Sequence, residues 1–252
     1  MTGERLYVYG IVDAEGPRLD LPAGVAGAAP FLHESGELGV IVSAVGEEER
    51  LGRAADARAH EEVLRGALQA RDPVLPVRFG SVYANAEQLE AELLVPAAAQ
   101  LEQLLAQLAG TVELELRALY PDQERMLREL VRDDPALARL RERVRRAADF
   151  HARIQLGEAT LDAFERRRAA DAALLWQRVA PFVRDHRARM ELPERVAAHL
   201  ALLVERGHVA DVEREAERLA EEVHERLVLR LVGPLPPYSF VAVELEPAAG
   251  VA

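Results

Sequence analysis

Runs of apolar residues predict strands at several places along the chain. Residues 6–12 (LYVYGIV) are rich in aromatic and β-branched side chains, which favour extended backbone. Residues 38–45 are almost continuously apolar, as in a central strand, and residues 31–32 begin its predicted hairpin partner. Residues 111–119 alternate between apolar and charged positions, which predicts a half-buried strand with Glu113 on its polar face. Further strands are predicted at 199–204, 227–232 and 239–245.

Apolar residues at helical spacing predict helices over 56–70, 86–108 and 211–226. Pro96 interrupts the second of these, Gly110 follows it as a C-cap, and Asp211 is the predicted N-cap of the third.

A longer helical region is predicted from 121 to about 190. One column of this region repeats every seven residues, and its members are Ile154, Leu161, Arg168, Leu175 and Phe182. The column fits a short coiled coil with a polar break. It fits equally well an ordinary amphipathic helix pair packed on a sheet.

Strands and helices occur in both halves of the chain, which predicts an α+β protein. We place the boundary between two domains near Gly110. The expected domains are an N-terminal α+β domain at 1–110 and a second domain at 111–252.

Two extended segments contain candidate functional residues. In 74–83 (VLPVRFGSVY), Arg78 and Phe79 lie among apolar residues. Arg78 is either a buried, paired arginine that binds a partner or organises the domains, or an arginine on the exposed face of an edge strand. In 233–245 (GPLPPYSFVAVEL), the prolines present Tyr238 in a set position. Tyr238 either anchors an interface or belongs to a rigid turn that sets the register of the last strand, and we favour the turn.

Composition and charge narrow the functional classes. The 252 residues are 50% hydrophobic and 29% charged, as in a globular protein. The net charge of −12 disfavours binding to nucleic acid, because the arginine runs at 139–146 and 166–168 are typical of solvated helix faces. No targeting signal or membrane span is evident, so we expect a cytoplasmic protein.

No catalytic, cofactor or metal site is predicted. The chain has no cysteine and no lysine, which excludes disulfides, cysteine nucleophiles and Schiff-base lysines. The seven histidines lack zinc-helix spacing, and neither a nucleophile elbow nor a dinucleotide-binding glycine motif occurs.

The ordered segments LYVYGIV, HEEVLRGAL with VLPVRFGSVY, and GPLPPYSFVAVEL resemble the gas vesicle protein F/L family over nearly the whole chain. The resemblance implies two α+β domains, the second a modified ferredoxin-like sheet with long, partly coiled-coil helices projecting at about 121–190. It also implies a non-enzymatic assembly protein of gas vesicles, without cofactors. Its expected partners are the hydrophobic shell protein (gas vesicle protein A) and other accessory proteins. The alternatives are a minor component retained in the shell, or a small-molecule-binding protein unrelated to vesicles.

Overall fold

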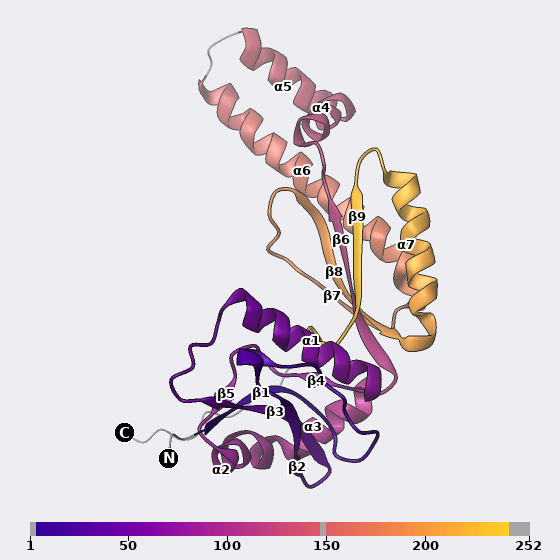
Figure 1. Cartoon of the computed structure of the whole chain (residues 1–252). Helices are drawn as coiled ribbons and strands as arrows, with labels where there is room; N and C mark the ends of the chain where they lie inside the picture. The colour runs from indigo at the N-terminus through magenta and orange to yellow at the C-terminus, as the bar shows by residue number, and fades with distance from the viewer. Residues whose placement is uncertain (1–3, 147–149, 242–252) are drawn as a thin grey trace. The chain divides into compact units, whose positions relative to one another are not determined.

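The computed structural model describes residues 4–146 and 150–241, which pack into two compact units. Unit 1 comprises the described residues of Met1–Glu113 and Gly233–Ala252, and unit 2 is Leu114–Val232. Both units combine helices with an antiparallel sheet, as the α+β prediction requires (Figure 1). Within the described ranges, no helix is long and apolar enough to cross a membrane.

The sheet of unit 1 is built around its first strand. Its strands are β1 (Glu4–Asp13), β2 (Pro30–Ser35), β3 (Leu38–Gly46), β4 (Leu75–Pro76) and β5 (Val82–Tyr83). The order is β2-β3-β1-β4, β5 also pairs with β1, and every pairing is antiparallel. The apolar runs predicted as strands form β1 and β3, whose side chains are buried on both faces. Pro76 lies on the edge strand β4, where a missing N–H disrupts no ladder.

Two helical segments complete unit 1. The first is α1 (Ala54–Ala70). The second is continuous and consists of α2 (Ala86–Leu89), a π-helical turn (Glu90–Leu94) and α3 (Val95–Leu108). A 3-10 turn spans Val25–Gly27. The predicted interruption at Pro96 is the π-helical turn just before it. Proline has no N–H to donate to the preceding helical turn, so the regular α-helical hydrogen bonding is broken there. Gly110, with a φ of 75°, follows the C-cap residue Ala109 and ends α3.

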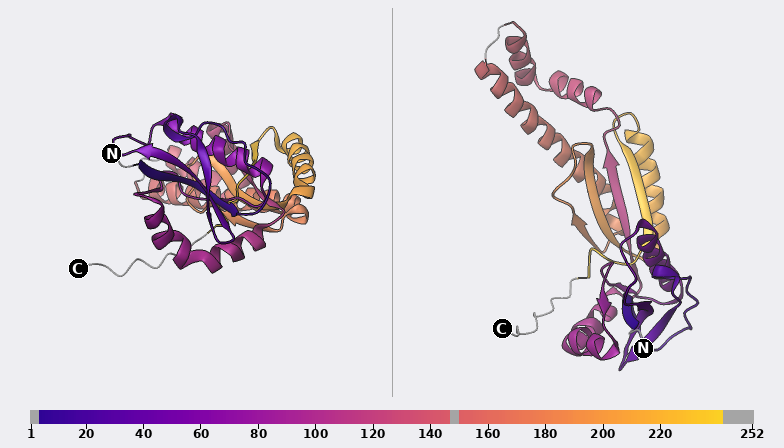
Figure 2. Two further views of the ribbon diagram at one scale, coloured as in Figure 1. Left: turned by 60° about the horizontal axis from the view of Figure 1, so that its bottom comes forward. Right: turned by 60° about the vertical axis from the view of Figure 1, so that its left-hand side comes forward.

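The sheet of unit 2 contains β6 (Thr111–Leu119), β7 (Asp185–Ala188), β8 (Val196–Glu205) and β9 (Val228–Leu235), with β6 and β9 crossing the boundary with unit 1. Its helices are α4 (Gln123–Asp133), α5 (Pro135–Arg146), α6 (Phe150–Val179) and α7 (Val209–Val223), with 3-10 turns at Ala180–Phe182 and Arg206–His208. The element order β-α-β-β-α-β and the strand order β7-β8-β6-β9 form a ferredoxin-like arrangement. Helices α6 and α7 pack together on one face of the sheet (Figure 2).

Several predicted boundaries are wrong. The long helical region ends at Phe182 rather than near 190, and the missed strand β7 follows it. Pro181 lacks the N–H that would continue the helix. The N-cap of α7 is His208, and Asp211 lies in the first turn, accepting a hydrogen bond from the His208 ring. The start of the predicted strand 239–245 is a turn, and its remainder from residue 242 lies outside the described residues.

Candidate functional site

Five side-chain rings of unit 1 lie close together, and we call them the tyrosine–histidine cluster. Its members are Tyr7, Tyr9, His60, Phe79 and Tyr238. Tyr7 and Tyr9 lie two residues apart on β1, on either side of a shift in the β1–β3 register, and both rings contact His60 of α1. His60, one of the buried residues of α1, lies 5.7 Å from the Tyr7 ring and 5.5 Å from the Tyr9 ring, centroid to centroid. The Phe79 ring meets His60 edge-on at 5.6 Å. The cluster therefore brings together residues from β1, α1, the β4–β5 connection and the C-terminal segment.

A chain of hydrogen bonds passes through His60. The Gly80 N–H donates to the Tyr7 hydroxyl at 3.1 Å, and the Tyr7 hydroxyl lies 2.9 Å from His60 Nδ1. On the other side, His60 Nε2 lies 3.2 Å from the Tyr238 hydroxyl, which donates to Glu61 Oε1 at 3.1 Å. The Tyr238 hydroxyl donates to Glu61, and the His60 ring also forms a hydrogen bond with the backbone of Val77. Every polar atom in this chain then has a partner.

Burial keeps these groups uncharged at neutral pH. Desolvation raises the pKa of Tyr7 to about 12 and lowers the pKa of His60 to about 4. Burial, followed by the nearby Glu61 carboxylate, raises the pKa of Tyr238 as well. A general acid or base works best with a pKa near the operating pH, and none of these three groups has one. The hydrogen bonds of the cluster hold together segments from β1, α1, the β4–β5 connection and the C-terminal segment.

Tyr9 fixes a second loop of unit 1 to the same cluster. Its hydroxyl lies 2.9 Å from Ser43 Oγ and accepts a hydrogen bond from the Val25 N–H at 2.8 Å. Gly24 permits this contact, because a Cβ there would come within 2.0 Å of the Tyr9 hydroxyl.

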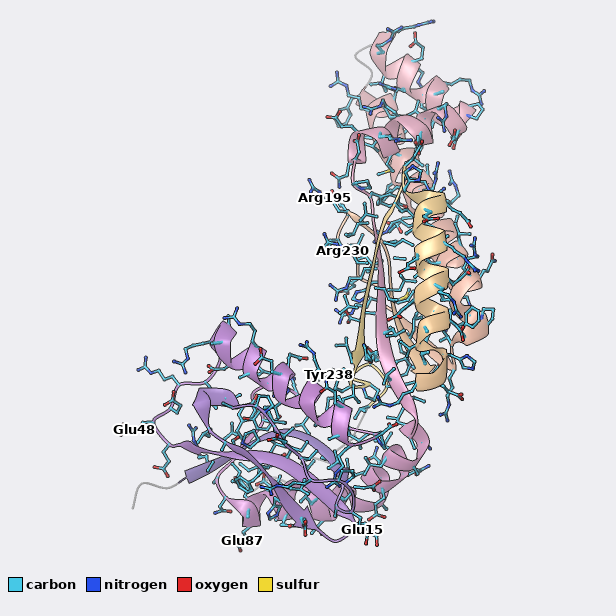
Figure 3. All side chains as sticks on the ribbon, turned by 45° about the vertical axis from the view of Figure 1, so that its right-hand side comes forward. Glu15, Glu48, Glu87, Arg195, Arg230 and Tyr238 are labelled. Carbon is cyan, nitrogen blue, oxygen red and sulfur yellow. The ribbon has the colours of Figure 1, made fainter. Side chains whose placement is uncertain are left out.

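The C-terminal segment is held at a second point by Glu113. The Ser239 N–H and hydroxyl donate to the two carboxylate oxygens of Glu113 at 2.7 and 2.8 Å. These bonds explain why Glu113, predicted on the polar face of its strand, is only 2% exposed. Together with Tyr238 (labelled in Figure 3), Ser239 fastens the residues after β9 to unit 1.

The structure separates the three candidate residues predicted from the sequence. Phe79 and Tyr238 both contact His60, whereas the Arg78 side chain is exposed and its carbonyl accepts a hydrogen bond from the Ser81 hydroxyl. Arg78 is thus not a buried arginine, and it lies between β4 and β5 rather than on the face of an edge strand. Its role in binding a partner stays a prediction. Sequence reasoning missed His60, although it lies at helical spacing from the apolar residues of α1.

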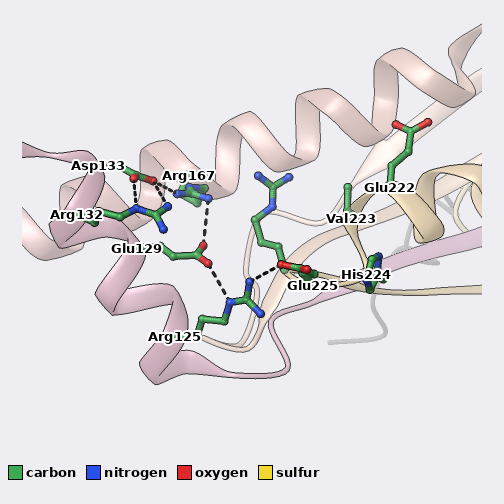
Figure 4. Close-up of a pocket in the computed structure, with 10 residues that line it drawn as sticks. Arg125, Glu129, Arg132, Asp133, Arg167, Glu222, Val223, His224 and Glu225 are labelled. Carbon is green, nitrogen blue, oxygen red and sulfur yellow. Dashed lines mark hydrogen bonds and ion pairs between the residues drawn. The ribbon is translucent and has the colours of Figure 1, made fainter.

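Unit 2 has a charged groove of about 620 Å³ beside α4, α6 and the end of α7 (Figure 4). Arg125 binds Glu129 at 3.0 Å and Glu225 at 2.9 Å, and Arg167 binds Asp133 at 3.0 Å. The charged lining consists of Arg125, Arg132, Arg167 and Arg226 with Glu129, Asp133, Glu222 and Glu225, besides His224. The arginines and carboxylates balance in number, so the groove lacks the excess positive charge of a phosphate site.

Buried Asp171 on α6 links three elements beside this groove. It accepts a hydrogen bond from the Tyr120 hydroxyl at 2.7 Å and pairs with Arg226 at 2.9 Å, and it is 2% exposed. Tyr120 follows β6 and Arg226 lies between α7 and β9. Among the residues the structure describes, no three His, Asp or Glu side chains converge as a metal site.

Two antiparallel sheets with their helices, fastened by buried hydrogen bonds and ion pairs, define the chain as an α+β protein. The family model described as "Gas vesicle synthesis protein GvpL/GvpF" matches residues 5–242, and the chain belongs to this family.

Relatives match over nearly their whole length. Gas vesicle protein F of Streptomyces sp. (strain CB03234) is 34% identical over 93% of this chain and 98% of its own length. Gas vesicle protein F1 of Halobacterium salinarum is 27% identical over 96% of this chain and 95% of its own length. The crystal structure of GvpF from Anabaena sp. PCC7120 superposes with a TM-score of 0.87 at 22% identity, covering 96% of this chain and 99% of that one. GvpF from Microcystis aeruginosa gives 0.83 at 20% identity, covering 95% and 99%. These two structures share the fold.

Proposed function

We propose that this chain is an assembly protein of gas vesicles that binds the hydrophobic shell protein, gas vesicle protein A, and supports vesicle formation. The observation that carries the proposal is the family match over residues 5–242, together with relatives of nearly equal length. The proposed role is binding rather than catalysis, and its proposed locations are the cytoplasm and the gas vesicle.

Physical chemistry supports such a role. A shell that excludes water from a gas space needs a subunit with an apolar face, and before assembly that face promotes aggregation. A partner that covers the face and carries a large net charge keeps the complex dispersed. The net charge of −12 fits this requirement.

We further propose that the loop carrying Arg78 and Phe79 contributes to the contact with the shell protein. Phe79 is 36% exposed and Arg78 is exposed beside it, so an apolar ring and a cation are both available to a partner. For Tyr238 we propose a domain-organising role, and its hydrogen bonds to His60 and Glu61 of α1 support this proposal.

Co-expression of the tagged chain with the shell protein, followed by co-purification, tests the proposal. We expect recovery of soluble shell protein with the chain, and at least a five-fold loss of recovery for Arg78→Glu. Arg58→Glu, an exposed change of the same kind on α1, is the matched control. Absence of association while the shell protein remains soluble would overturn the proposal.

A urea wash of purified vesicles then separates the two roles expected for this family. An assembly protein that acts from outside should be removed by the wash. A chain that stays with the washed vesicles is a retained minor component of the shell.

A further inference from the structure

Helices α4, α5 and α6 form an apolar groove of about 410 Å³ within unit 2. Figure 1 shows α4 and α5 beside the first half of α6. The apolar lining consists of Leu127 and Val131 of α4 and Leu156 of α6. Leu127 is 42% exposed, whereas Val131 and Leu156 are partly buried against the core of the unit. Apolar surface is therefore available to a partner at a concave place.

The sequence of α4 explains why apolar side chains line this groove. Met126 and Leu130, one turn apart, are buried in the core of unit 2 at 7% and 5% exposure. Leu127 and Val131 each follow one of these residues directly, so they lie about 100° further round the helix. The core of the unit uses the first pair, and the second pair lines the groove.

The lining favours a helical partner over an extended one. Leu156 and Thr160 lie one turn apart on α6, and the Thr160 hydroxyl donates to the Leu156 carbonyl at 2.6 Å. The backbone groups of a helix are bonded within that helix, so the groove offers none to a partner. An extended peptide would bury unpaired backbone groups there, whereas a helix bonds its own. A helix also presents side chains three and four residues apart, which fit between the ridges of α4 and α6.

The rim of the groove carries an excess of positive charge. Arg128 and Glu124 form an ion pair at 3.5 Å, and Arg141 of α5 also lines the groove. Arg153 precedes Leu156 by three residues and shares its face of α6. In the part of the chain that the structure describes, neither Arg141 nor Arg153 has an ion-pair partner. Both guanidinium groups are therefore available to carboxylates of a partner.

We propose that this groove binds an acidic amphipathic helix of another protein. The apolar side chains of that helix enter the groove, and its carboxylates meet Arg141 and Arg153. The charge of the rim selects acidic helices over basic ones. Because the groove accepts only a few side chains, the contact is smaller than a standard stable interface and the complex should be transient. The proposal involves only unit 2, so it is independent of the shell-protein contact proposed for the loop carrying Arg78.

Fluorescence anisotropy of a labelled synthetic peptide tests the proposal with the full chain. The probe is a helical peptide with leucines three and four residues apart along one face and glutamates on both flanks. We expect saturable binding, although the chain's net charge of −12 repels this peptide as a whole. Binding must therefore come from a local site. Absence of saturable binding would overturn the proposal.

Substitutions at the groove locate the binding. Leu127→Asp should weaken binding of the peptide about ten-fold, and Arg141→Glu should weaken it about five-fold. Leu161→Asp, at an exposed leucine on another face of α6, and Arg139→Glu, at an exposed arginine on another face of α5, are the matched controls. Both controls should bind as the natural chain does. Equal losses in the controls and the groove variants would refute binding at the groove.

A disulfide cross-link tests the position of the peptide, because the natural chain contains no cysteine. Thr160→Cys should cross-link to the peptide when it carries one cysteine on its apolar face. Asp162→Cys, exposed on another face of α6, should cross-link about five-fold less. Equal cross-linking of both variants would contradict the proposal.

Vesicles with and without anionic lipid test a membrane as the alternative occupant. We expect no difference between the natural chain and Leu127→Asp in binding to these vesicles. If the vesicles bound the natural chain and not Leu127→Asp, while the peptide failed to cross-link at Thr160→Cys, the groove would be a membrane contact and the proposal would be wrong.

Discussion

The two units differ most in how they use charge. Unit 1 has 20 Asp and Glu residues against 8 Arg, whereas unit 2 has 23 of each, so the entire net charge of −12 belongs to unit 1. The polar centre of unit 1 is nevertheless made of neutral, buried groups joined by hydrogen bonds. Unit 1 also buries the carboxylates of Asp56 and Glu113. Among its described residues, unit 2 combines one buried carboxylate, that of Asp171, with many ion pairs at its surface.

This difference has physical consequences. Neutral buried hydrogen bonds are insensitive to salt but respond to any pH change that would charge one of their members. Surface ion pairs are screened by salt and contribute little individually. Since the only tryptophan, Trp176, stacks on His186 at 3.7 Å within unit 2, its fluorescence reports the unfolding of that unit alone.

The largest expected effect concerns the buried carboxylate of unit 2. Asp171→Ala leaves the buried Tyr120 hydroxyl without its acceptor and Arg226 without its counter-ion. Removing one partner of a buried pair costs about 3–5 kcal/mol, so the free energy of unfolding should fall by that amount. Urea titration followed by Trp176 fluorescence measures it. Asp162→Ala, exposed on the same helix, should change stability by less than about 0.5 kcal/mol; equal losses for both would show that Asp171 is not a structural centre.

The second-largest expected effect is a loss of stability of unit 1 at low pH. The pKa of His60, ordinarily 6.5, is lowered to about 4 by burial, so the folded state favours the neutral ring. The unfolded state binds more protons between these values, and stability should therefore fall by about 3 kcal/mol as the pH drops from 6.5 to 4. Below pH 4 the contribution is already lost.

Hydrogen exchange of the β1 and α1 amides, followed as a function of pH, measures this loss of stability in unit 1. Burial lowers the pKa of His199 in unit 2 in the same direction, so a single-histidine comparison is needed. His60→Gln should flatten the pH dependence of exchange in unit 1, while His199→Gln should leave it unchanged. An unaltered profile in His60→Gln would mean that other groups govern the acid response of unit 1.

The sequence predicted the elements of both units more completely than their polar centres. Hydrophobic periodicity located β1, β3, α1, β6, β8 and α7, because each has a clear buried face. It missed β7, a short edge strand whose residues Asp185–Ala188 carry no apolar alternation. The division into domains at 1–110 and 111–252 stays a prediction, since packing into units does not test which segments fold alone.

The polar centres depend on contacts that local patterns do not encode. Tyr238 and His60 are 178 residues apart, and Ser239 and Glu113 are 126 apart. Alternation places Glu113 on a polar face, and only the return of the C-terminal segment turns that position into a buried one. Family resemblance pointed to the segments of Tyr7, Phe79 and Tyr238, but not to the hydrogen bonds through His60 that join them.

A smaller effect is expected where the C-terminal segment meets unit 1. Glu113→Ala removes both acceptors of Ser239, and hydrogen bonds to a charged group contribute about 1.5–3 kcal/mol. We expect faster hydrogen exchange of the Ser239 amide and a smaller change in the exchange of the β3 amides. Glu102→Ala, exposed on α3, serves as the control. Unchanged exchange at Ser239 would indicate that Tyr238 alone holds the segment.

The smallest effect should come from the surface ion pairs of unit 2. Arg125 joins Glu129 to Glu225, and its hydrogen bonds lower the pKa of Glu225, yet its side chain is 42% exposed. Arg125→Gln should therefore lower the urea midpoint of Trp176 fluorescence only slightly in dilute buffer. At about 1 M salt, where the Debye length is roughly 3 Å, the midpoint should match that of the natural chain. The same salt should leave the loss in Asp171→Ala nearly intact, because a buried pair is screened much less. If salt erased both effects equally, the distinction between a buried centre and a screened surface in unit 2 would fail.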